Sequence, residues 1–151
     1  MKTNGRIKMN KKAEQFNAFL EEQKIKVFQM EEIEGNELNT VVFRSFLGVE
    51  GQQLPTIVIV DDSIFTVIRV QIAPQALKAE NEADLLKLAN GQSAMYKPFK
   101  LYFDERGDLM LDVCLVTDAD KLDGNEVYQI FNVIINYLDE NYRNIMKVVW
   151  R

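Results

Sequence analysis

The sequence contains no histidine. Histidine is the side chain that most often serves as a general base near neutral pH, and it is also the commonest metal ligand. Ser-His-Asp and Cys-His arrangements for nucleophilic catalysis are therefore excluded. We expect a protein that is not an enzyme, with no catalytic residue, no cofactor and no metal site.

The chain has a single cysteine, Cys114, so neither an internal disulfide nor a thiolate metal cage can form. Cys114 stands in an apolar, strand-like run, which predicts a buried and unreactive thiol. A nucleophilic thiol would need a base or a positive charge beside it. Sparse cysteine is typical of proteins in reducing compartments, so we expect a cytoplasmic location.

Glycine is also sparse, and long apolar runs are missing. The seven glycines are scattered and form neither of the glycine-rich motifs that cradle phosphate groups. No run approaches the roughly 20 apolar residues of a membrane span. Residues 1–12 lack the apolar stretch of a signal peptide. We therefore expect no membrane association.

The formal net charge is −5, which does not suit nucleic-acid binding, because that binding depends on lysine and arginine. We expect no nucleic-acid partner. A loose basic group with glutamates among it lies near the N-terminus. Its lysines are Lys8, Lys11, Lys12, Lys24 and Lys26. We interpret this group as a solvated helix face, and a contact site for anions is the alternative.

The rest of the composition is that of a globular protein. The chain has 151 residues, of which 47% are hydrophobic and 27% are charged. A chain of this length can bury a core of its own as one domain. We assign residues 1–10 to a flexible N-terminal extension, in which Met9 is an alternative start, and residues 11–151 to a single domain.

Periodicity predicts the elements of the first two thirds. Apolar residues at three- and four-residue spacing predict helices over 11–23 and 81–90, the second capped by Asn81 and ended by Gly91. Four β-rich runs with short turns between them predict an antiparallel meander. These runs are 25–34, 39–48, 54–60 and 64–72.

The last third predicts a β-hairpin over 99–116 with a loop from Asp104 to Asp108. A long helix follows, capped by Asp123, with Glu126 three residues later as in a capping box. The element order is then α-β-β-β-β-α-β-β-α. This order is typical of an α+β domain with a largely antiparallel sheet and helices packed mainly on one face.

Several segments between residues 85 and 140 match the pattern of a known family. They are Leu88-Ala89-Asn90, Leu101-Tyr102-Phe103-Asp104, Gly107-Asp108-Leu109, Leu111-Asp112-Val113, and the helix with Ile130, Phe131, Ile134 and Leu138-Asp139. On these segments the chain resembles the YbjN-like family of bacterial proteins, which are regarded as sensory transduction regulators. The resemblance implies a fold similar to that of type III secretion chaperones, and dimerisation or binding of protein partners. It implies no catalytic residue.

Acidic residues gather at the turns. Asp118, Asp120, Asp123 and Gly124 are similar to the start of a calcium-binding loop, but the spacing is one residue too long and the final glutamate is missing. Helix capping and solubility explain them. Turn chemistry equally explains the acidic residues around the hairpins, which are Asp61, Asp62, Asp104, Asp108 and Asp112.

The sheet offers a better candidate site. If Leu109, Leu111, Val113 and Leu115 face the helices, the opposite side of the sheet carries apolar side chains and two arginines. Exposed apolar patches mark interaction sites, and aromatic, methionine and arginine residues are enriched there. The predicted partner-binding residues are Val42, Arg44, Phe46, Phe65, Val67, Arg69, Tyr102, Met110 and Val116. Coverage by the terminal arm, or scattered surface apolar residues, are the alternatives.

We therefore expect a protein-binding module, chaperone- or adaptor-like, that uses this apolar sheet face. Its partner is a second copy of the chain, giving a homodimer, or another protein. The alternative function is a small-ligand sensor or regulator with a cavity between the sheet and the C-terminal helix.

Overall fold

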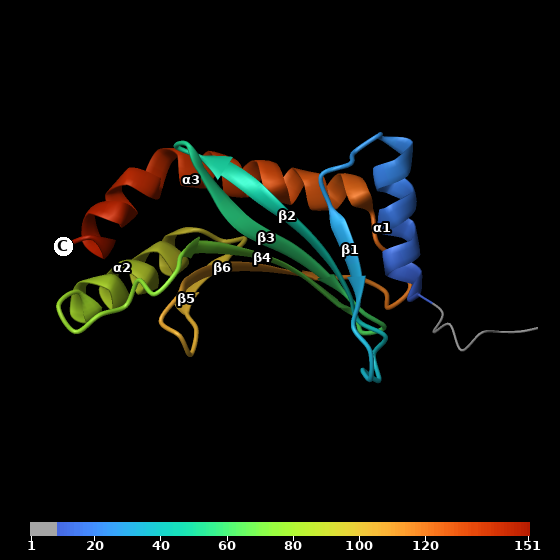
Figure 1. The fold of residues 1–151 in the computed structure, drawn as a ribbon, viewed down its shortest axis with the longest axis horizontal. Helices are drawn as coiled ribbons and strands as arrows, with labels where there is room; N and C mark the ends of the chain where they lie inside the picture. Colours follow the sequence, from blue (N-terminus) through green and yellow to red (C-terminus); the bar gives the residue numbers. More distant parts are fainter. Residues whose placement is uncertain (1–8) are drawn as a thin grey trace, which may run out of the picture.

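A six-stranded antiparallel sheet with three helices forms the protein in a computed structural model that describes residues 9–151 (Figure 1). The predicted α+β class and element order are confirmed. The elements are α1 (Lys11–Glu22), β1 (Gln29–Glu32), β2 (Val41–Val49), β3 (Gln52–Val60), β4 (Phe65–Ala73), α2 (Glu82–Met95), β5 (Lys100–Phe103), β6 (Leu109–Val116) and α3 (Gly124–Val149).

The strands lie in the order β1-β2-β3-β4-β6-β5, and all neighbours are antiparallel. The predicted meander is therefore correct, with the β5–β6 hairpin added beside β4. Glu50 and Gly51 join β2 to β3, and both have positive φ angles. A two-residue hairpin of this kind matches the right-handed twist of the strands.

The core lies between the sheet and α3, which runs along one face of the sheet (Figure 1). Strand alternation turns Val58, Ile68, Leu109 and Leu111 toward this helix, and none of them is more than marginally exposed. α1 packs against one end of α3, and α2 lies at its other end beside β5. The helices therefore cover one face and leave the opposite face of the central strands open.

The residue before α1 is firmly held. Asn10 is buried, and its Oδ1 accepts a hydrogen bond from the Ala13 backbone N–H at 2.7 Å. Its Nδ2 donates to the carbonyls of Asn39 and Val60. Asn10 thus caps α1 and belongs to the domain rather than to the flexible extension to which we assigned it. Met9 of the same extension is half-buried against the core, and residues 1–8 lie outside the described residues.

Lys12 corrects the interpretation of the basic group as a solvated face. Its side chain is buried, and its Nζ donates to the carbonyls of Ser63 and Phe65 and to Thr66 Oγ1 at 2.8–3.0 Å. Burial lowers the pKa of Lys12, and the nearby carboxylates of Asp61 and Asp62 partly oppose that shift. Its ammonium therefore fastens α1 to the start of β4.

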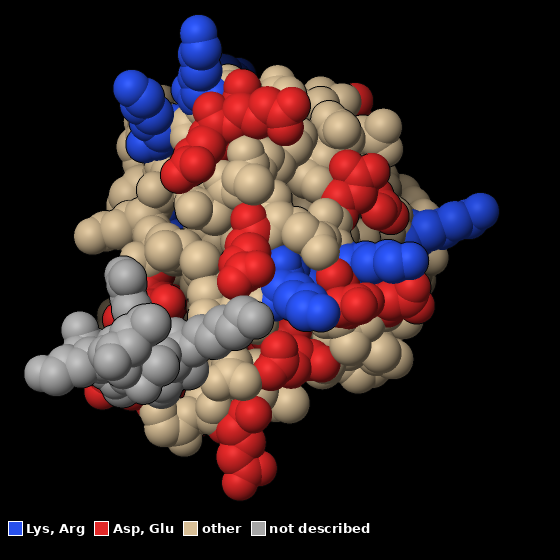
Figure 2. Space-filling model, turned by 90° about the vertical axis from the view of Figure 1, so that its right-hand side faces the viewer, with Lys and Arg blue, Asp and Glu red and all other residues tan. Residues whose placement is uncertain are grey.

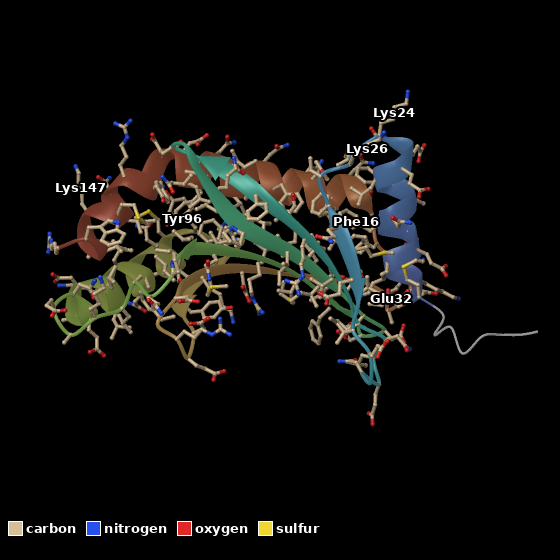
Figure 3. The ribbon with its side chains drawn as sticks, viewed as in Figure 1. Phe16, Lys24, Lys26, Glu32, Tyr96 and Lys147 are labelled. Carbon is tan, nitrogen blue, oxygen red and sulfur yellow. The ribbon has the colours of Figure 1, made fainter. Side chains whose placement is uncertain are left out.

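The remaining lysines of that group differ from Lys12. Lys11, Lys24 and Lys26 are exposed, as expected, while Lys8 lies outside the described residues. Figure 3 shows Lys24 and Lys26 extending into solvent beyond the C-terminal end of α1. The group is thus a partly solvated surface from which one member turns inward.

Two details of α2 also depart from the prediction. The helix continues past Gly91 to Met95, because an isolated glycine costs a helix only about 1 kcal/mol. Asn81 precedes the helix, but its side chain makes no capping bond to it. Instead, its Nδ2 donates to the carbonyls of Ala76 and Val149. Asn81 therefore ties the loop before α2 to the end of α3.

The C-terminal third follows the sequence prediction closely. Asp104 and Asp108 bound the loop of the β5–β6 hairpin, and Asp123 Oδ1 accepts a hydrogen bond from the Asn125 N–H at 2.9 Å, which confirms the predicted cap.

β1 is shorter than predicted and occupies only four residues of the 25–34 run.

Candidate interaction surface

The strand register brings all nine predicted partner-binding residues to one side of the sheet. Val42 lies opposite Ile59, which lies opposite Val67, and Val67 lies opposite Cys114. The next row runs from Arg44 through Ile57 and Arg69 to Asp112. We call this side the outer face, and it comprises the nine predicted residues with Ile57, Ile59, Asp112 and Cys114.

The outer face exposes large apolar side chains. Val116, Phe46 and Phe65 are 65%, 60% and 48% exposed, and Val67 and Met110 are half-buried. Val42 is only 7% exposed, so it adds little accessible surface. None of these six side chains belongs to the hydrophobic core cluster beneath α3. They form a second apolar layer, and none of the helices in residues 9–151 packs against it.

Ile57 and Ile59 are members of this layer that the sequence interpretation missed. Both are half-buried on β3, between the rows of β2 and β4. The run 54–60 is almost continuously apolar, so alternation could not assign its faces. Ile57 lies opposite Arg44 of β2 and Arg69 of β4. This pairing would have assigned Ile57 and Ile59 to the outer face.

The prediction of a buried thiol at Cys114 is wrong. Cys114 is a free and exposed cysteine. It lies on β6 between two inward-facing residues, so strand geometry turns it to the outer face. Its apolar surroundings in the sequence predicted burial, but they belong to a face that no helix among residues 9–151 covers.

Both arginines of the outer face are paired within the chain. The Arg69 guanidinium donates to both oxygens of Asp112 at 2.9 Å, and the Tyr102 hydroxyl donates to the same carboxylate at 3.0 Å. Arg44 pairs with Glu31 at 2.8 Å on the adjacent edge. The outer face therefore combines apolar area with two internally paired arginines and with Lys100, which is in register with Asp112 and lies 5.1 Å from the centre of the Tyr102 ring.

This network includes two groups with raised pKa values, Arg69 and Tyr102. The hydrogen bond with Asp112 raises the pKa of Arg69 above its ordinary value. Burial raises the pKa of Tyr102, and the Asp112 carboxylate adds to the shift. Asp112 was interpreted as a turn residue, but it lies within β6 and is 7% exposed. It is thus the buried centre of a three-residue network.

The other acidic residues at the turns perform the structural roles expected of them. Asp104 Oδ1 accepts from the Arg106 and Asp108 N–H groups, and Asp61 Oδ1 accepts from the Ser63 N–H. Asp118 pairs with Lys121 at 3.4 Å. Among residues 9–151, no cluster of three or more histidine, cysteine, aspartate or glutamate side chains is placed to hold a metal ion.

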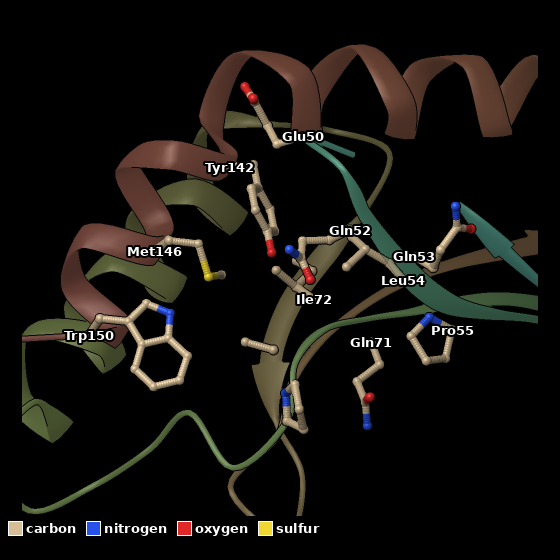
Figure 4. A pocket seen from close by; sticks show the side chains of 12 residues that line it. Glu50, Gln52, Gln53, Leu54, Pro55, Gln71, Ile72, Tyr142, Met146 and Trp150 are labelled. Atoms are coloured by element: carbon tan, nitrogen blue, oxygen red, sulfur yellow. The ribbon is translucent and has the colours of Figure 1, made fainter. Parts of the chain in front are cut away.

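A separate pocket of about 610 Å³ lies between the last turns of α3 and the ends of β3 and β4. Figure 4 shows Tyr142, Met146 and Trp150 projecting from α3 toward Gln52 and Ile72. Trp150 is 72% exposed and is the only tryptophan in the sequence. The pocket is therefore walled on one side by the helix and on the other by the sheet.

Figure 2 shows acidic side chains spread over the end of the molecule that carries α1, with basic side chains among them rather than in one patch. No helix of residues 9–151 is long and apolar enough to span a membrane. No protein-family model matches the chain, and no curated protein sequence matches it as a relative.

Proposed function

We propose that the protein is a non-enzymatic protein-binding module, adaptor- or chaperone-like and related to the YbjN-like family, whose outer face binds a second copy of the chain. The observation that carries this proposal is the second apolar layer, which is exposed at Phe46, Phe65 and Val116 and separate from the core. Removing apolar surface from water stabilises an association by about 25 cal/mol per Å².

The size of the face suits a stable dimer. With about 3.3 Å per residue and about 4.8 Å between strands, the six strands cover a footprint of about 680 Å². Stable protein–protein interfaces bury roughly 600–1,000 Å² on each partner. The outer face is therefore large enough for a complete interface without help from the helices.

The charges of the face favour a copy of itself as the partner. Each arginine has its own carboxylate, Asp112 for Arg69 and Glu31 for Arg44. Lys100 on the edge strand β5 is a further charge of the face, so two such faces meet with little repulsion, although each chain carries a formal charge of −5. A two-fold axis brings the same patch of both copies together. A strongly charged partner would instead require unpaired charges on this face.

We also propose the cytoplasm as the compartment. Cys114 is exposed and has no other cysteine in the chain to pair with. A reducing compartment keeps such a thiol free, whereas an oxidising one favours disulfides between chains.

Replacing Phe65 by lysine tests the proposal. The substitution puts a charge into the exposed apolar layer of the proposed interface, so we expect the dimer to dissociate into folded monomers. Light scattering over a range of concentrations measures the mass, and circular dichroism checks the fold. Leu86→Lys on α2 is the matched control, because Leu86 and Phe65 are each 48% exposed.

The control variant should keep the mass of the unmodified protein. Equal masses for the unmodified protein and for both variants at every concentration would contradict self-association through this face.

A further inference from the structure

The pocket beside α3 arises where the sheet splits. β3 and β4 pair only from Thr56–Val70 to Val60–Thr66. Gln52–Pro55 stay paired with β2, and Gln71 and Ala73 stay paired with β6. Pro55 has no N–H group with which to continue the ladder, and β4 is irregular between Gln71 and Ala73. The two strands diverge here, and the pocket occupies the gap.

We propose that this pocket binds a flat, uncharged, ring-shaped small molecule that carries an amide or lactam group. Its volume, about 610 Å³, lies within the roughly 300–1,000 Å³ of small-molecule sites. Trp150 and Tyr142 supply aromatic surface against which a planar ring stacks, with Met146 between them on α3 (Figure 4).

The polar groups of the pocket select an amide. Gln52, Gln53 and Gln71 line it, and each side-chain amide can both donate and accept hydrogen bonds. Gln71 Nε2 donates to Asp108 at 3.1 Å, which leaves its Oε1 as an acceptor. The tryptophan ring adds an N–H donor. A ligand with a donor and an acceptor on neighbouring atoms therefore satisfies this set.

The charges around the pocket disfavour an anion. Glu50 is the single charged residue among those that line it, and Arg143 binds that carboxylate at 3.1 and 3.2 Å. The C-terminal end of α3, which carries the negative end of the helix dipole, lies at the pocket wall. Lys78 lies 5.1 Å from the centre of the Trp150 ring but does not line the pocket. A buried carboxylate would lose its hydration without gaining a partner.

Two matched pairs of probes test the inference: nicotinamide against nicotinate, and benzamide against benzoate. Trp150 gives the single indole N–H signal of the protein, so NMR titration follows the pocket directly. We expect both amides to shift this signal saturably, with dissociation constants of about 1 mM or below, and both acids to bind at least about ten-fold more weakly.

Substitution of the pocket wall supplies the control. Gln52→Leu should weaken binding of both amides about five-fold, the effect of losing one hydrogen bond. Gln129→Leu, at an exposed position of α3 outside the pocket, should leave it unchanged. Both positions are exposed, so both variants should remain folded.

The inference is overturned if neither amide shifts the Trp150 signal saturably, if the acids bind as tightly as the amides, or if the Gln52 and Gln129 variants behave alike. These results do not depend on the oligomeric state, so they are separate from the test of the outer face.

Discussion

Gly124 shows how one residue governs the contact between two helices. A Cβ atom at this first position of α3 would coincide with the base of the Phe19 ring from α1. The Phe19 ring is held between Phe16 and Tyr128, its neighbours on α1 and α3. The ring can therefore make room for a methyl group only by leaving this aromatic cluster.

Gly124→Ala should accordingly destabilise the protein by about 1–3 kcal/mol, the usual cost of overpacking. Gly91→Ala is the matched control, because a Cβ there meets nothing within 4 Å and alanine favours a helix over glycine by about 1 kcal/mol. Urea denaturation of the two variants should thus give shifts of opposite sign. A gain in stability from Gly124→Ala would contradict this description of the contact.

At the scale of residues, the sequence predicted local roles well and long-range ones poorly. Asp123 caps α3 as expected, because a cap depends on residues only a few positions away. Lys12 and Cys114 were assigned the wrong environments. The burial of Lys12 depends on carbonyls more than 50 residues away, and the exposure of Cys114 depends on which face the helices leave open.

At the scale of elements, the Asp112 carboxylate joins three strands. It lies on β6, binds Arg69 of β4, and accepts a hydrogen bond from Tyr102 of β5. The Asp112 side chain is only 9% exposed and that of Arg69 is 35% exposed. Removing the carboxylate charge leaves the guanidinium without its partner on a partly desolvated surface.

Asp112→Asn should therefore lower the free energy of unfolding by about 1–3 kcal/mol and should also weaken self-association, because an unpaired positive charge then faces its own copy. Asp118→Asn, at an exposed ion pair, is the control and should change stability by less than about 1 kcal/mol. Thermal unfolding and light scattering measure the two effects. An Asp112 variant with unchanged stability and mass would count against both roles.

The strands were predictable because their turns and their alternation lie in the sequence itself. The hairpin at Glu50 and Gly51 and the hairpin around Gly107 both use positive φ angles, and glycine was a visible signal at each. The split between β3 and β4 was not predictable in the same way. Pro55 indicated that a hydrogen-bond ladder must end near it. It did not indicate that the C-terminal end of α3 would lie beside the gap between the two strands.

At the scale of the whole molecule, the three helices of the described residues lie on one face of the sheet, and within residues 9–151 the other face is left uncovered. The sequence predicted the α+β order and most of the outer face, since strand alternation assigns residues to sides, but not Ile57 and Ile59 of β3. Strand alternation does not predict which partner covers that face, because the partner depends on the surface of the folded protein and not on the sequence pattern. The proposed answer is a second copy of the chain.

Labelling of Cys114 with a thiol reagent tests this central claim most directly. The labelling rate and the molecular mass are both measured over a range of protein concentrations. Cys114 is the only cysteine and lies on the outer face. We predict that its labelling rate falls as the mass rises from 17.5 kDa to twice that value, and that Phe65→Lys keeps labelling fast. A mass of 17.5 kDa with an unchanged labelling rate at all concentrations would contradict the account.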